Sequence, residues 1–147
     1  MDVNKKGPYL AAALICEKVL EEKDEVKSAI RIFDRLMIEV PEDPACSFDA
    51  FQYELYLLFI FKMEETAEKI YHLKVSLIDP HGEMKSTFDL EVPFEGGDKR
   101  GIDVVISTSF RFDQGGTYWF SVYLNDEWLT KIPLRIELYQ RSAQEIN

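Results

Sequence analysis

Cysteine and histidine are scarce in this chain, with two of each among its 147 residues. Cys16 and Cys46 are too few for a disulfide framework, and each lies in or beside an apolar run, where a thiol behaves as a small hydrophobic group. His72 and His81 do not stand at the spacings that zinc ligands require. We therefore predict neither a disulfide framework nor a metal centre.

Recognisable catalytic motifs are also missing. The pairs Gly96-Gly97 and Gly115-Gly116 have the form of turns rather than of a phosphate-binding loop. No nucleophile signature surrounds Cys46 or His81, so a hydrolase built on these two residues is only a third hypothesis. Paired carboxylates occur in any chain this acidic, and glycoside hydrolysis demands a separation that sequence does not give. We predict a protein that is not an enzyme and needs no cofactor.

The chain has fewer basic than acidic residues: 17 Lys and Arg against 27 Asp and Glu give a formal net charge of −10. Such a chain repels phosphate backbones and anionic lipids, so we expect no binding to nucleic acid or membrane. No segment approaches the ~18 apolar residues of a membrane span. The run from Pro8 to Cys16 is barely long enough for a secretory signal, and Ile15 stands where a cleavage site has a small residue. We expect a cytoplasmic protein.

Apolar side chains, in contrast, are plentiful. Hydrophobic residues make up 46% and aromatic residues 13% of the sequence. A chain of this length buries roughly 68–70% of its unfolded surface, which is enough for a core without a metal or disulfide. We expect an extension at 1–8, one domain at 9–140 and a polar tail at 141–147.

Residues 116–124 show the clearest pattern. If the segment is extended, its even-numbered residues point to one face and its odd-numbered residues to the other. The first face carries Tyr118, Phe120, Val122 and Leu124, and the second carries Trp119, Ser121 and Tyr123. This period of two is typical of a strand with one buried face. Residues 125–127 form a turn, and the alternation resumes from Trp128 to Leu138.

Two earlier segments are harder to assign. Residues 9–20 suit a helix by composition, but they are apolar on both parities, which favours a strand buried on both faces. We favour the strand. Residues 28–40 alternate clearly, and Asp34 interrupts their apolar parity, which indicates a bulge or a break.

Further alternating segments cover residues 53–63, 71–77, 88–94 and 102–112, with a turn at Asp79-Pro80-His81-Gly82. About eight strands without intervening helices predict an all-β fold, an antiparallel two-sheet β-sandwich. Gly116-x-Tyr118-x-Phe120 is similar to the tyrosine corner of immunoglobulin-like domains, with Phe120 at the usual cysteine position.

Four blocks also resemble a family of small bacterial β-sandwich proteins of unknown function. They are residues 14–20, 28–35, 77–82 and 116–120, and the resemblance extends over roughly residues 9–138. It implies a β-sandwich and a strand for the first segment. It implies no activity and assigns no site residues.

The best candidates for a binding surface are large aromatic side chains on the strand face opposite the core-facing residues. Trp119, Tyr123 and Trp128 are anchors of the kind that protein interfaces use. Arg31, Phe33 and Arg35 form a second candidate surface. We therefore predict an accessory or adaptor protein that binds another protein; exposed edge strands also permit a homodimer.

The alternative is a ligand-binding module that uses the loops at 41–49, 79–84 and 113–116. If neighbouring strands are antiparallel, these loops emerge at one end and bring together Asp43, Asp49, Asp79, Glu83 and Asp113. Converging carboxylates suit Ca²⁺, and exposed aromatic rings could stack on sugars. Turn formation by Asp is the competing explanation.

Overall fold

The computed structural model describes residues 7–40, 51–64, 69–94 and 101–140, and within them the chain forms nine strands and no helix. The strands are β1 (Tyr9–Glu21), β2 (Lys27–Ile32), β3 (Arg35–Val40), β4 (Phe51–Lys62), β5 (Lys69–Ile78), β6 (Met84–Phe94), β7 (Gly101–Phe112), β8 (Gly116–Leu124) and β9 (Glu127–Gln140). The all-β class and the strand over residues 9–20 are thus confirmed. The expected extension and tail fall almost entirely outside the described residues.

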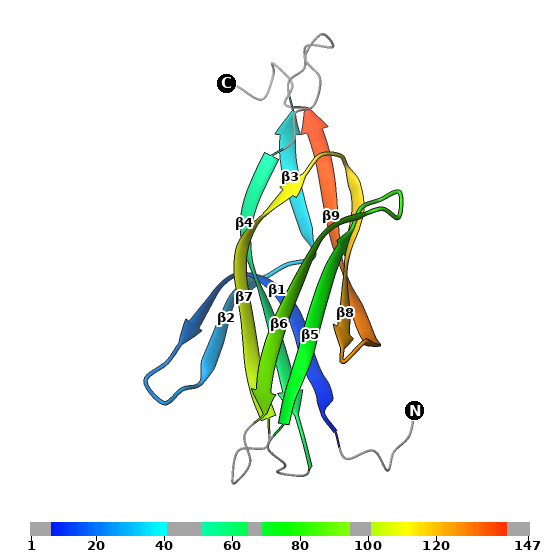
Figure 1. The fold of residues 1–147 in the computed structure, drawn as a ribbon. Helices are drawn as coiled ribbons and strands as arrows, with labels where there is room; N and C mark the ends of the chain where they lie inside the picture. The colour runs from blue at the N-terminus through cyan, green and yellow to red at the C-terminus, as the bar shows by residue number, and fades with distance from the viewer. Residues whose placement is uncertain (1–6, 41–50, 65–68, 95–100, 141–147) are drawn as a thin grey trace.

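The strands form two sheets (Figure 1). The four-stranded sheet has the order β2-β1-β4-β7, and the five-stranded sheet has the order β3-β9-β8-β5-β6. Neighbouring strands are antiparallel except for β3 and β9, which run parallel from the Arg35–Arg135 pair to the Val40–Gln140 pair. The prediction of an antiparallel arrangement is therefore wrong at this one edge, and the described strands number nine where about eight were expected.

The cause of that departure lies at Phe33 and Asp34. The backbone N–H of Phe33 donates to the carbonyl of Ile15 on β1 (3.0 Å), whereas the carbonyl of Asp34 accepts from the N–H of Arg135 on β9 (2.8 Å). Two consecutive residues thus belong to different sheets. The segment predicted as one strand divides at Asp34 into β2 and β3, and the chain crosses from the first sheet to the second.

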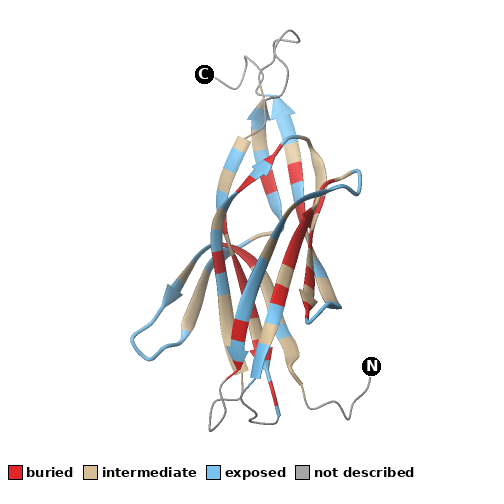
Figure 2. Cartoon of the chain, in the orientation of Figure 1, coloured by how far each residue is buried: buried red, intermediate tan, exposed pale blue. Residues whose placement is uncertain are grey.

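The core lies between the two sheets. Phe110 on β7 meets Phe120 on β8 edge to face, with ring centroids 5.1 Å apart, and Phe61 on β4 meets Phe94 on β6 at 6.0 Å. Figure 2 shows buried residues recurring along β5 and β9 between more exposed ones, as one-sided burial of a strand requires. Both sheets therefore contribute to a single hydrophobic core.

The turn between β8 and β9 has two residues, Asn125 and Asp126, with φ of 48° and 64°. Positive φ at both positions is the signature of the tight hairpin turn that matches strand twist. This turn fixes the register in which Tyr123 stands opposite Trp128.

Candidate functional site

The predicted aromatic residues gather on the outer face of the five-stranded sheet. Tyr118, Phe120 and Val122 of β8 face the core, so the alternation turns Trp119 and Tyr123 outward. Trp128 of β9 pairs with Tyr123, and its side chain is 54% exposed. All three aromatic residues selected from the sequence thus share one surface.

A lysine accompanies each of two of these rings. The Nζ of Lys131 lies 4.3 Å from the ring centroid of Trp119, and the Nζ of Lys74 lies 5.0 Å from that of Tyr123. Each contact is a cation–π interaction, worth about 0.5–1 kcal/mol at an exposed site. Within the described ranges no carboxylate forms an ion pair with either lysine. We call the surface formed by Trp119, Tyr123, Trp128, Lys74 and Lys131 the lysine–aromatic face.

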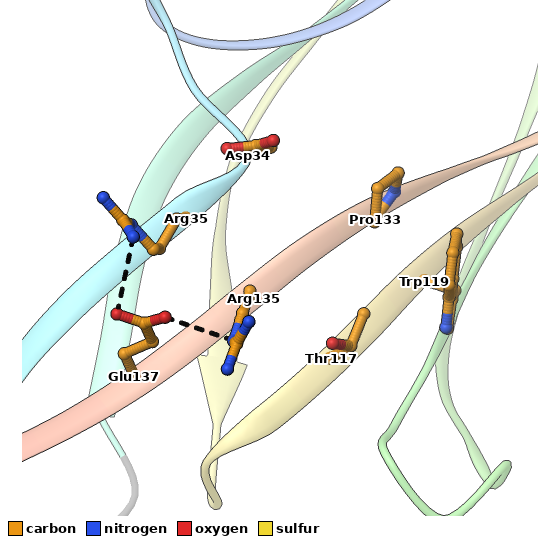
Figure 3. Close-up of a pocket in the computed structure, with 7 residues that line it drawn as sticks. All are labelled: Asp34, Arg35, Thr117, Trp119, Pro133, Arg135 and Glu137. Carbon is orange, nitrogen blue, oxygen red and sulfur yellow. Dashed lines mark ion pairs between the residues drawn. The ribbon is translucent and has the colours of Figure 1, made fainter.

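A shallow hollow of about 400 Å³ adjoins this face where β3, β9 and β8 run side by side (Figure 3). Trp119 forms one end of it, and two arginines on neighbouring strands form the other. The lining residues are Asp34, Arg35, Thr117, Trp119, Pro133, Arg135 and Glu137. We call this feature the arginine hollow.

Glu137 lies between the two arginines of the hollow, as the dashed lines in Figure 3 show. One carboxylate oxygen is 3.2 Å from Nε of Arg135, and the other is 3.8 Å from Nη1 of Arg35. Both arginine side chains remain more than half exposed. Each therefore keeps N–H donors directed to solvent, where an incoming carboxylate or carbonyl can accept from them.

The second candidate surface is not a single surface in the structure. Arg35 belongs to the arginine hollow. Arg31 lies on β2 in the other sheet, where it forms an ion pair with Glu17 at 2.9 Å. Phe33 lies between the sheets, half-buried, with its ring edge to face with Tyr53 at 6.4 Å. The sheet crossing at residues 33–34 separates the three side chains.

Asp79 organises the turn between β5 and β6. Its side chain is 1% exposed, and its Oδ1 accepts hydrogen bonds from the backbone N–H groups of His81 and Glu83, both at 2.9 Å. Burial alone would raise its pKa, but these hydrogen bonds and the nearby Lys85 outweigh it, and the pKa of Asp79 lies below its usual value. The turn predicted at residues 79–82 is confirmed, with the capping carboxylate that the sequence indicated.

Lys85 occupies the centre of the predicted acidic end. Its Nζ lies 3.4 Å from Asp79, 3.5 Å from Glu83 and 3.9 Å from Asp113. The carboxylates from the loops at 79–84 and 113–116 thus converge as the sequence suggested, but they converge on an ammonium group of the chain itself. The hydrogen bond to Asp79 is the main reason that the pKa of Lys85 is raised.

Among the residues that the structure describes, no group of three or more His, Cys, Asp or Glu side chains is placed to hold a metal ion. Asp43 and Asp49, the other expected calcium ligands, lie outside those residues, as does Cys46 of the hydrolase hypothesis. His81 is exposed in its turn.

Tyr118 connects the same end of the molecule to the core. Its hydroxyl donates to the Asp113 carboxylate at 2.8 Å and accepts from the backbone N–H of Asp113 at 3.1 Å. The hydrogen bond from Tyr118 is the main cause of the lowered pKa of Asp113. Burial raises the pKa of Tyr118 to about 12.

We expect the contribution of Asp79 to stability to disappear in acid. A carboxyl group whose pKa is lowered by folding stabilises the native state fully at pH values above its unfolded-state pKa. This stabilisation is lost as the pH falls through the folded-state pKa. Asp79→Asn should therefore lower the melting temperature at neutral pH and lower it progressively less below pH ~4. Thermal melts across this range check the result, with Glu83→Gln as the exposed control. An Asp79→Asn difference that stays constant into acid would show that the charge is not responsible.

The chain belongs to the family of unknown function DUF6941, whose model matches residues 11–137. The resemblance to a family without an assigned activity is thereby confirmed. No curated protein matches the sequence. None of the described segments is a helix capable of crossing a membrane.

Two solved structures are similar to the chain at low sequence identity. One is a glycosyl hydrolase family 2 member from Bacteroides cellulosilyticus, 14% identical over 64% of this chain, with a TM-score of 0.48. The other is the alkylpurine DNA glycosylase AlkC of Pseudomonas fluorescens bound to DNA with an abasic site analog, 11% identical over 85% of the chain, with a TM-score of 0.45. The matches span only 14% and 30% of those proteins.

Sequence reasoning missed most of the polar residues around the aromatic anchors. Lys131 and Arg135 share the outward parity of Pro133 on β9, so the alternation that selected Trp119 could also have selected them. Lys74 likewise lies on the polar parity of β5. No local signal indicated that Arg35 of β3, and Asp34 just before it, would join the same surface, because their position depends on the parallel β3–β9 pair.

Proposed function

We propose that this protein is a non-enzymatic interaction module that binds another protein through the lysine–aromatic face and the arginine hollow. The observation that carries the proposal is the gathering of Trp119, Tyr123 and Trp128 on one face of one sheet. Tryptophan, tyrosine and arginine are the residues that most often dominate the energetics of protein interfaces. A rigid sheet holds them in place before binding, which reduces the entropy cost of association.

The charges suggest what the partner presents. Lys74 and Lys131 have no carboxylate partner in the described part of the chain, and Arg35 and Arg135 share one. Acidic side chains of a partner would pair with these groups as its apolar side chains cover the rings. Binding should therefore weaken as ionic strength rises, because salt screens exposed charges.

The proposal includes an immunoglobulin-like sandwich as the scaffold. Its support is the order β1-β4-β7 in one sheet and β5-β8-β9 in the other, which corresponds to strands A-B-E and C-F-G of that fold. The hydroxyl of Tyr118, bonded to the backbone five residues upstream, corresponds to the tyrosine corner. The free, buried thiol of Cys16 supports a reducing compartment such as the cytoplasm.

Partner capture with matched variants tests the proposal. The immobilised whole chain should retain a specific protein from an extract of the cells that make it, and Trp119→Ala with Tyr123→Ala should abolish that retention. Both rings are half-buried on an outer face, so we expect the variant to keep its circular dichroism spectrum. Val26→Ala, at an exposed position on the β1–β2 turn, is the control that should retain the partner. Equal recovery by the double variant and the wild type would refute the proposal.

A further inference from the structure

Four strands lie at the edges of the two sheets, and three of these edges are protected. β2 and β3 are six residues long each. β6 has a bulge opposite Leu77 and Ile78 and contains Pro93, which has no N–H group to donate. Short strands, bulges and proline are the means by which proteins prevent another chain from pairing with an open edge.

The fourth edge strand, β7, has none of these features. It is twelve residues long, contains no proline and pairs with β4 in one unbroken register from Gly101–Lys62 to Phe112–Phe51. Its residues 104–110 are uncharged. Among the described strands, none pairs with its other edge. The N–H and C=O groups of alternate β7 residues are therefore available to a further strand.

A pocket of about 430 Å³ lies along this edge, between β7 and β6, which Figure 1 shows on the same side of the molecule. Three consecutive residues of β7 line it, namely Ser109, Phe110 and Arg111. Consecutive residues of a strand point to opposite faces of the sheet. All three can reach one pocket only because it follows the open edge of the strand.

The inner wall of the pocket is apolar. Leu77, which lines it, is 2% exposed, and Phe88 of β6 meets Phe110 of β7 edge to face with ring centroids 5.4 Å apart. Arg111 is exposed at the rim and forms no ion pair with any residue that the structure describes. The pocket therefore fits a large apolar side chain, and its rim fits an acidic one.

We propose that an extended segment of another protein pairs with β7 as a fifth strand of the four-stranded sheet and inserts one side chain into this pocket. In this mode of recognition, main-chain hydrogen bonds supply affinity and a pocket for an alternate side chain supplies specificity. The segment carries a large apolar residue opposite Phe110 and, next to it, an acidic residue opposite Arg111. A second copy of this chain is disfavoured, because the formal charge of −10 on each copy opposes association.

Selection on the immobilised whole chain from a phage library of random peptides, each as long as β7, tests the inference. The selected peptides should share a large apolar residue directly beside Asp or Glu. Methylation of the peptide's backbone nitrogens at alternate residues should abolish binding in one phase of the alternation and leave it unchanged in the other, because only alternate N–H groups face β7. The bound peptide should slow hydrogen exchange at alternate amides of β7 and at none of β2.

Charge reversal tests the register. Arg111→Glu should weaken the binding of a selected peptide by roughly fivefold, and replacing the peptide's acidic residue with Lys should restore it. Lys23→Glu makes the same charge change at an exposed position of the β1–β2 turn and should leave the affinity unchanged.

Four outcomes would each overturn the proposal. They are a selection that yields no binding peptide, equal tolerance of methylation in both phases, exchange slowed at β2 instead of β7, and a dimer of the chain alone in which the β7 amides are protected. The last would assign the edge to a second copy. Because β6 and β7 carry no member of the lysine–aromatic face, the result is independent of whether partner capture succeeds.

Discussion

Phe120→Ala is expected to lower the free energy of unfolding by about 3–5 kcal/mol, the range measured when a buried phenylalanine is truncated in a core that cannot collapse around the cavity. Phe120 is fully buried at the point where the two sheets meet. Its neighbour Phe110, from the opposite sheet, is 2% exposed and contacts it edge to face. Removing Phe120 therefore opens a cavity beside Phe110, whose remaining ring contact across the interface is with Phe88 at 5.4 Å.

Urea denaturation of single and double variants measures this effect. If both rings fill one space, the effects of Phe110→Ala and Phe120→Ala should not add, because contacting residues are energetically coupled. Tyr139→Ala, at an exposed position near the end of β9, should change stability by less than about 0.5 kcal/mol. A loss below about 1 kcal/mol for Phe120→Ala would mean that the sheets do not share the tight core described above.

Tyr118→Phe is expected to lower the free energy of unfolding by about 1–3 kcal/mol, although it removes a single oxygen atom. The hydroxyl is the donor to the Asp113 carboxylate and the acceptor for the Asp113 backbone N–H. The variant leaves both groups without that partner at the start of the turn into β8. Tyr123→Phe, whose hydroxyl lies on the outer face, is the matched control and should be close to neutral.

The same hydroxyl predicts a loss of stability in alkali. Folding raises the pKa of Tyr118 from 10.0 to about 12, so the native state holds this proton more tightly than the unfolded chain does. The resulting stability is complete below pH ~10 and is lost as the pH rises through the folded-state pKa. The stability difference between wild type and Tyr118→Phe should therefore shrink above pH ~10. A difference that does not change with pH would contradict the assignment of the raised pKa to this hydroxyl.

The alternation of side chains predicted the strands well, because one-sided burial imposes a period of two that is visible in the sequence. It separated Tyr118 and Phe120, which are buried, from Trp119 and Tyr123, which are not. It also located the interruption at Asp34. The sequence could not show that the chain changes sheets there, because a strand has the same alternation whichever neighbour it pairs with.

That crossing also explains the uneven prediction of the candidate site. Trp119, Tyr123 and Trp128 belong to one hairpin, and its short turn fixes their common face. Arg31, Phe33 and Arg35 span the crossing, so nearness in sequence did not place them on one surface. The acidic loops at 79–84 and 113–116 were correctly expected to converge, whereas the loop at 41–49 lies outside the described residues. Lys85, which lies between the two loops, comes from the start of β6 and carries no motif.

Hydroxyl-radical footprinting of the whole chain, with and without its captured partner, tests the proposed function most directly. Oxidation of Trp119, Tyr123 and Trp128 should decrease in the complex, while oxidation of Met84, which is 64% exposed at the start of β6, should not change. Undiminished oxidation of the three aromatic residues in a complex that demonstrably forms would contradict the assignment of this face as the binding surface.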